Sequence, residues 1–215
     1  MKKDNIKVIK FIIFLCLLQG TSYYICKLTP FTKTQLISSF DNNIVRDPNF
    51  VFFYISWFPM LVIVPFLVFK SDKDNLFKYA GMYIMGIIVS FLTFFFFPTI
   101  IVREELIVNN VSSWILNVVY LFDTPASNCL PSMHVFSCLL FIYFSFKIKN
   151  KNKLTEYILR ISIIFLSIMI IVSTLVIKQH VIYDIIGAII LFFIALTGEK
   201  IFKISSKVSD LYKKI

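Results

Sequence analysis

The sequence predicts an all-α fold, a polytopic membrane helix bundle of six transmembrane helices. Hydrophobic residues make up 58% of the chain and aromatic residues 17%. Long apolar runs recur along it, and short clusters of Lys and Arg lie between them. This composition argues against an ordinary soluble domain and excludes a disordered or fibrous protein. Residues 1–215 are expected to form a single membrane-embedded domain.

The apolar runs define the predicted spans, because a hydrocarbon core of roughly 30 Å requires about 20 mostly apolar residues in a helix. The first run follows a basic start, as in a signal peptide, but no small-residue cleavage site follows it, so it is predicted to be a span. A further apolar segment, 111–122, is too short to span and is predicted to be an interfacial helix between the third and fourth spans. The six predicted spans are 8–28, 50–69, 79–102, 131–146, 157–177 and 181–202.

The basic residues give the predicted orientation, since cytoplasmic loops of membrane proteins are enriched in Lys and Arg. With the N-terminus inside, most of the 22 basic residues fall on the cytoplasmic side. We therefore predict a multi-pass protein of the plasma membrane with both termini in the cytoplasm. The polar residues that this orientation brings to the outer face include Arg103, Ser132, His134, Lys178, His180 and Asp184.

The formal charge of +10 does not indicate a nucleic-acid partner, because such binding needs basic residues gathered on a folded soluble face. The expected partner is the bilayer, and the sequence does not indicate an oligomeric state. The four cysteines lack metal-ligand spacing, and no acidic cluster resembles a magnesium site, so no metal or cofactor is expected. Cys26 and Cys129 both fall near predicted helix ends, which leaves a disulfide between them open.

A polar stretch at residues 128–135 opens the fourth predicted span and contains one of only two histidines. Pro131 suits a first helical turn, and the free amides of that turn, with the Ser132 hydroxyl, form a site suited to a phosphate. An ionisable residue such as His134 beside a membrane-length segment is a functional candidate. The alternative is that Pro131 and Ser132 only begin a helix and that His134 is an interfacial polar residue.

The second histidine has a carboxylate four residues away. On a helix, His180 and Asp184 would share one face. A carboxylate there fixes the tautomer of the imidazole and stabilises positive charge on it, as a nucleophilic or basic histidine requires. The alternative is an ordinary hydrogen bond on a helix surface.

Arg103 and Lys178 place positive charge at the level of the histidines. Phosphoryl transfer depends mainly on positioning and on neutralising charge, which these cations and Ser132 could supply without a metal. His180 would then attack phosphorus, and His134 would protonate the leaving oxygen. The alternative is that both cations extend to water at the interface, or that Arg103 is neutralised by the two glutamates that follow it.

Two motifs resemble the type-2 phosphatidic acid phosphatase superfamily. They are P-S-M-H at residues 131–134 and S-T-x5-H-x3-D at residues 173–184, against the pattern K-x6-R-P, P-S-G-H and S-R-x5-H-x3-D. The resemblance covers roughly residues 98–187. It implies that His180 is the nucleophile that forms a phosphohistidine, Asp184 its orienting carboxylate and His134 the general acid. Arg103, Ser132 and nearby amides would hold the phosphate.

The sequence departs from that pattern at four positions. Phe96 and Thr174 stand where the family has cations, so Lys178 is the expected substitute. The motif forms resemble the branch of inositol phosphorylceramide and sphingomyelin synthases, which transfer a phospho-headgroup between lipids. The other two departures are Glu104 for Pro and Met133 for Gly.

The sequence therefore predicts a metal-independent membrane enzyme, a lipid phosphatase or phospho-headgroup transferase acting at the outer face on a lipid phosphate ester. The expected substrate-binding residues are Arg103, Ser132, Met133 and Lys178. One alternative is a non-catalytic transporter or lipid-binding protein that keeps the anion site, although the charges stay near the span ends. Another is an inactive descendant, which the missing cations suggest and the retained histidines oppose.

Overall fold

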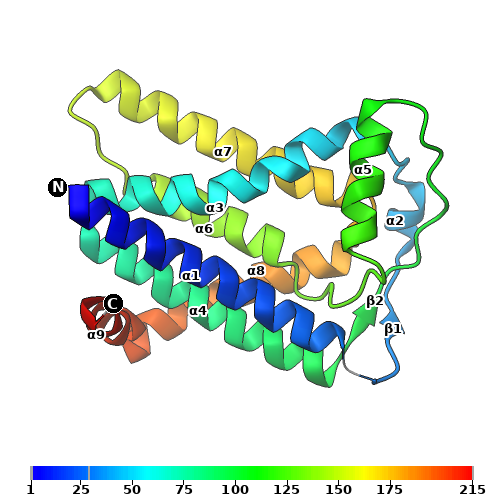
Figure 1. Ribbon diagram of the computed structural model, residues 1–215, viewed down its shortest axis with the longest axis horizontal. Helices are drawn as coiled ribbons and strands as arrows, with labels where there is room; N and C mark the ends of the chain where they lie inside the picture. Colours follow the sequence, from blue (N-terminus) through cyan, green and yellow to red (C-terminus); the bar gives the residue numbers. More distant parts are fainter. Residues whose placement is uncertain (1, 29, 215) are drawn as a thin grey trace.

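The computed structural model describes residues 2–28 and 30–214, most of which are helical. The long helices lie side by side along one axis (Figure 1), and five of them are long and apolar enough to cross a membrane. The all-α prediction is thereby confirmed, together with the multi-pass character of the chain. These helices are α1 (Lys2–Lys27), α3 (Val51–Ser71), α4 (Lys73–Phe96), α7 (Lys153–Val176) and α8 (Ile182–Phe202).

Helix α4 shows how a proline moves a predicted boundary. It was expected over 79–102, but it begins at Lys73 and ends at Phe96. At its start the Asp72 side chain caps the helix by accepting from the Asp74 backbone N–H. At its end, the residue before Pro98 is forced out of the helical region. The chain beyond Pro98 is then extended and forms β2 (Thr99–Ile100).

The fourth predicted span, 131–146, is a shorter helix than expected. Helix α6 (Met133–Ser145) has 13 residues, which at 1.5 Å per residue gives about 20 Å, less than the roughly 30 Å of the hydrocarbon core. Six helices of membrane-crossing length are therefore not found in the described part of the chain.

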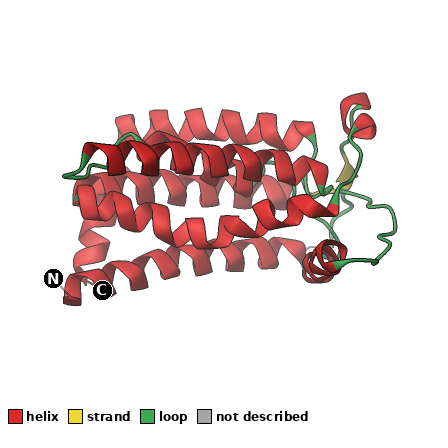
Figure 2. Ribbon diagram, turned by 90° about the horizontal axis from the view of Figure 1, so that it is seen from above, coloured by secondary structure: helices red, strands yellow, loops and turns green. Residues whose placement is uncertain are grey.

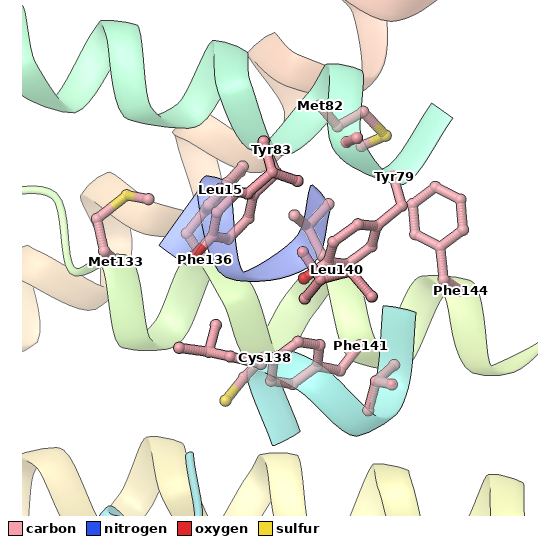
Figure 3. Close-up of a cluster of buried hydrophobic side chains, with 14 of the residues drawn as sticks. Leu15, Tyr79, Met82, Tyr83, Met133, Phe136, Cys138, Leu140, Phe141 and Phe144 are labelled. Carbon is pink, nitrogen blue, oxygen red and sulfur yellow. The ribbon is translucent and has the colours of Figure 1, made fainter. Parts of the chain in front are cut away.

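Helix α6 nevertheless lies in the core of the bundle, where it contacts α3, α4, α7 and α8. Figure 3 shows Phe136 and Phe144 on the side of α6 that faces α4. Phe144 packs edge-on against Tyr79, with ring centroids 5.5 Å apart. Phe136 lies so close to α4 that a Cβ at Gly86 would be 2.2 Å from its ring. Glycine is therefore required at that helix crossing.

Five of the shorter elements gather at one end of the bundle (Figure 1). Strands β1 and β2 pair in parallel, with Thr34 opposite Thr99, and Ile100 forms a bridge with Ser127. The segment after α4 is thus fixed beside the segment before α6. These elements are β1 (Thr34–Gln35), α2 (Ser39–Asn43), the 3-10 helix η1 (Pro48–Phe50), β2, and α5 (Val111–Phe122).

Helix α5 has the predicted bounds and lies across this end of the bundle (Figure 1). Both termini lie at the opposite end, close to each other in two views (Figures 1 and 2). The C-terminus is reached through a helix that was not predicted, α9 (Ile204–Lys214), after a left-handed turn at Lys203 with φ 48°. The Tyr212 ring of α9 packs edge-on against Phe11 of α1.

Candidate active site

The two histidines, distant in sequence, meet at the end of the bundle that holds α5. His134 lies in the first turn of α6, and His180 lies in the turn that precedes α8. Their rings approach so that His134 Nδ1 is 3.2 Å from His180 Nε2. This is a hydrogen-bond distance, so one of these nitrogens holds a proton and the other accepts it.

His180 is oriented by Asp184 from the opposite side. The His180 Nδ1 and the Val181 backbone N–H both lie 3.0 Å from the same carboxylate oxygen, Asp184 Oδ2. Because the carboxylate accepts, His180 carries its proton on Nδ1 and directs the Nε2 lone pair at His134. The two residues were expected on one helix face. Instead His180 precedes α8, and Asp184 reaches back to it from the first turn.

The turn that carries His180 is closed by main-chain bonds. Gln179 N–H and His180 N–H both donate to the Thr174 carbonyl, at 2.9 and 3.0 Å, and Lys178 takes a left-handed conformation with φ 54°. Thr174 itself is fully buried. Thr174 therefore contributes its backbone carbonyl to the closure of the turn.

Ser132 connects the two histidine segments. Its backbone N–H donates to the Asp184 carbonyl at 3.1 Å, and its buried hydroxyl caps α6 by accepting from the Val135 N–H at 3.3 Å. Gly187 allows this close approach, since a Cβ there would lie 2.6 Å from a Leu130 methyl. In this arrangement the Ser132 hydroxyl serves the helix cap.

Arg103 reaches the His180 segment, as expected. Its Nε donates to the Lys178 carbonyl at 3.1 Å, and its Nη2 donates to Gln179 Oε1 at 2.7 Å. The guanidinium also lies 4.3 Å from the Tyr120 ring centroid and pairs with the Asp123 carboxylate. The residue that neutralises Arg103 is therefore Asp123.

The other expected binding residues occupy different places. The Lys178 ammonium donates to the Asp41 carbonyl at 2.8 Å, while the Asp41 carboxylate accepts from the Ile182 N–H at 2.9 Å. These contacts hold Lys178 against α2. Met133 does face the cavity, and its sulfur accepts from the Ser90 hydroxyl at 3.0 Å. Phe96 is 77% exposed and contributes no polar group.

Sequence reasoning missed Asp123, which joins three segments. Its carboxylate accepts from the Tyr23 hydroxyl and from Arg103, and the Lys27 ammonium lies 3.9 Å away. The Lys27 side chain is only 8% exposed, and within the described residues its nitrogen has no hydrogen-bond partner. One feature of the sequence could have identified Asp123. It is the single carboxylate between the apolar segments 111–122 and 131–146, on the predicted outer side, which holds few cations.

A cavity of about 450 Å³ opens beside the histidines. Aromatic rings form much of its wall, and His134 packs 4.2 Å from Trp57 and 4.8 Å from Tyr54, measured between centroids. Its polar residues include His134, His180, Asp123, Gln179, Ser127 and Asn128. In the described part of the chain, the buried atoms Gln179 Nε2, Ser127 Oγ and Asn128 Oδ1 make no hydrogen bond.

These unpaired atoms indicate a polar ligand, because a buried polar group without a partner is costly. The rest of the wall suits an apolar chain. A molecule with a polar head and an apolar tail therefore matches the cavity.

The cysteines and possible metal ligands complete the description. No disulfide joins the described cysteines, which are Cys16, Cys26, Cys129 and Cys138, so the disulfide left open between Cys26 and Cys129 is not formed. Burial raises the pKa of the Cys129 thiol well above its ordinary value, and nearby carboxylates add to that effect. Across residues 2–28 and 30–214, no group of three or more His, Cys, Asp or Glu is placed to hold a metal ion.

No protein-family model, curated protein or solved structure matches this chain. The chemistry of the site is therefore inferred from its geometry.

Proposed function

We propose that this protein is an integral membrane enzyme that cleaves a phosphate ester of a lipid and passes the phosphate-bearing group to water or to an alcohol. The observation that carries the proposal is the hydrogen-bonded series Asp184, His180 and His134 at the head of an apolar cavity. The resemblance of the motifs at 131–134 and 173–184 to the type-2 phosphatidic acid phosphatase superfamily supports it.

The reaction takes two displacements. The His180 Nε2 lone pair attacks phosphorus, the N–P bond forms, and the bond from phosphorus to the leaving oxygen breaks. That oxygen takes a proton from His134, which enters the step as an imidazolium and leaves it as a neutral imidazole, while Asp184 stabilises the positive charge on His180. Water or an alcohol then gives a proton to His134 and attacks phosphorus, and the N–P bond breaks.

The two ring nitrogens are 3.2 Å apart, so the phosphate must enter between them. His134 is the ring that gives way. Contacts with the Trp57 and Tyr54 rings hold it, whereas a buried carboxylate and a closed turn fix His180. Entry of the substrate therefore replaces the bond between the histidines with bonds to phosphate oxygen.

A lipid is the proposed substrate because the cavity is mostly apolar and lies among helices suited to a bilayer. We place α6 as a sixth, shorter pass, with both termini in the cytoplasm and the site at the outer face of the plasma membrane. The histidines lie at the beginnings of α6 and α8, whereas the termini lie at the end of the bundle opposite α5 (Figure 1). The loops at that same end hold the clusters of Lys that are typical of a cytoplasmic face.

The test uses purified full-length protein in detergent micelles. Phosphate release and headgroup transfer are measured from phosphatidic acid, a prenyl diphosphate, a lysophospholipid and diacyl phospholipids, each with an alcohol acceptor present and absent. Wild type should turn over at least one lipid, and a phosphate-labelled lipid should leave label on the protein that His180→Ala abolishes. Folded wild type that neither releases phosphate nor moves a headgroup across the panel would refute the proposal.

The pairing of Arg103 with Asp123 favours one other function, a lipid-binding or transport protein without chemistry, because a neutralised guanidinium stabilises a transition state less. That function predicts saturable binding of a lipid phosphate with no labelled protein and no turnover.

A further inference from the structure

Two cations and one carboxylate meet beside the histidines. Arg103 and Lys27 both face Asp123, and Arg103 also holds Gln179, the neighbour of His180 in sequence. Asp123 and His180 line the same cavity. Lys178, which was expected at this level together with Arg103, instead donates to the Asp41 carbonyl.

Two buried donors of this group lack a hydrogen-bond partner among the described residues. They are Lys27 Nζ and Gln179 Nε2. Gln179 is 4% exposed and lines the cavity. Its oxygen already accepts from Arg103, which leaves the amide nitrogen free to donate to a ligand. Donors of this kind, next to a guanidinium, bind oxygens of a phosphate.

We infer that Asp123 is a specificity-determining residue that tunes this phosphate site to a singly charged phosphodiester over a doubly charged phosphomonoester. Its carboxylate cancels one of the two positive charges contributed by Arg103 and Lys27. One unit of positive charge then remains to balance the ligand. The inference concerns the substrate of the proposed enzyme, so its consequence for catalysis rests on the proposed function.

The physical reason is the cost of unbalanced charge away from water. A monoanion bound near Arg103, Lys27 and Asp123 leaves the group neutral, whereas a dianion leaves an excess negative charge. Asp184, beyond His180, is a further anion and increases that penalty. Burial of Lys27 and Arg103, whose side chains are 8% and 9% exposed, reduces the screening by solvent that would otherwise weaken the discrimination.

The test compares two ligands with one tail and different charge, monooctyl phosphate and methyl octyl phosphate. Their dissociation constants are measured at pH 8 by quenching of tryptophan fluorescence in full-length protein in micelles. Wild type should bind the diester at least about tenfold more tightly, which corresponds to about 1.4 kcal/mol. At pH 5, below the second pKa of a phosphomonoester near 6, the preference should disappear.

Three variants separate charge from structure. Asp123→Asn should shift the ratio of the two constants toward the monoester by about 10- to 100-fold, whereas Lys27→Gln should shift it the other way. Tyr23→Phe removes a hydrogen bond to Asp123 without changing charge, and should leave the ratio unchanged. If Asp123→Asn does not fold, Lys27→Gln decides the direction.

The inference is overturned if wild type binds neither ligand, if it prefers the monoester, or if both charge variants keep the wild-type ratio. Because binding needs no turnover, the ratio is also measured in His180→Ala. A charge-dependent ratio in a wild type that turns over no lipid would refute the proposed function and leave the role of Asp123 standing.

Discussion

The variant Asp184→Asn is expected to remove the charge from the His180 pair while keeping its geometry. One carboxylate oxygen, Asp184 Oδ2, accepts both the His180 Nδ1–H and the Val181 N–H, each at 3.0 Å. The other oxygen has no partner within the described chain. An amide oxygen can take the place of Oδ2. The backbone N–H of Val181 can only donate, so it keeps the oxygen, and not the amide nitrogen, in that place.

The magnitude follows from the change in hydrogen-bond strength. A hydrogen bond to a charged group contributes about 1.5–3 kcal/mol and a neutral one about 1 kcal/mol. The loss of about 0.5–2 kcal/mol, at 1.36 kcal/mol per tenfold, predicts a fall in turnover of about 2- to 30-fold. In a Ser-His-Asp triad the same substitution costs about 10⁴-fold, because the histidine adopts the wrong tautomer. Asp184→Ala, which removes the orienting group, should approach that larger loss.

The chain has only two histidines, so histidine-selective nitrogen-15 labelling gives a direct assay by NMR. Wild type and Asp184→Asn should both show a protonated Nδ1 on His180, and Asp184→Ala should not. Turnover of a lipid phosphate is measured on the same samples. The reasoning is refuted if the Asn variant moves the proton to Nε2, or if it loses as much turnover as the Ala variant.

His134→Gln should lower turnover of an alkyl phosphate ester by about 10²- to 10⁴-fold. Turnover of a nitrophenyl ester should fall much less, because nitrophenolate leaves without a proton. Equal losses in kcat for the two esters would contradict the role of His134 as the acid. Asp41→Ala should lower the free energy of unfolding by about 3 kcal/mol, measured by denaturation in micelles, because three charge-assisted hydrogen bonds are lost; a change below about 1 kcal/mol would count against its role at the start of α8. Gly86→Ala should cost about 1–3 kcal/mol by overpacking the Phe136 ring, whereas the control Gly20→Ala, with nothing within 4 Å, should be neutral or slightly stabilising.

Local patterns predicted most of the helices, because a long apolar run is expected to be buried in lipid or protein whichever other elements it contacts. They also predicted that His180 and Asp184 would meet, since that pair is four residues apart. The predicted length of α6 was wrong, because an apolar run does not show at which residue the helical hydrogen bonds begin. Pro131 and Ser132 are apolar or small enough to extend the run, but Ser132 is the cap that precedes the helix.

The partners of the charged residues could not be read from the sequence. Arg103 pairs with Asp123 instead of the adjacent glutamates, and Lys178 binds a carbonyl in α2, far away in the chain. Both choices depend on how the loops at one end of the bundle fold over each other. Local spacing carries no information about such contacts, so the sequence did not show that Lys27 approaches Asp123 while Lys178 binds α2.

The bond from Ser132 N–H to the Asp184 carbonyl makes the beginnings of α6 and α8 a single mechanical unit. The cavity wall contributed by α1 and α4 lies outside this unit, whereas Trp57 and Tyr54 of α3 hold His134 within it. In the proposed enzyme, α1 and α4 would accommodate a lipid tail of different length or saturation without altering the spacing of the histidines. Selection for a new tail is thereby decoupled from selection for chemistry, and the wall can diverge while the reaction centre stays fixed.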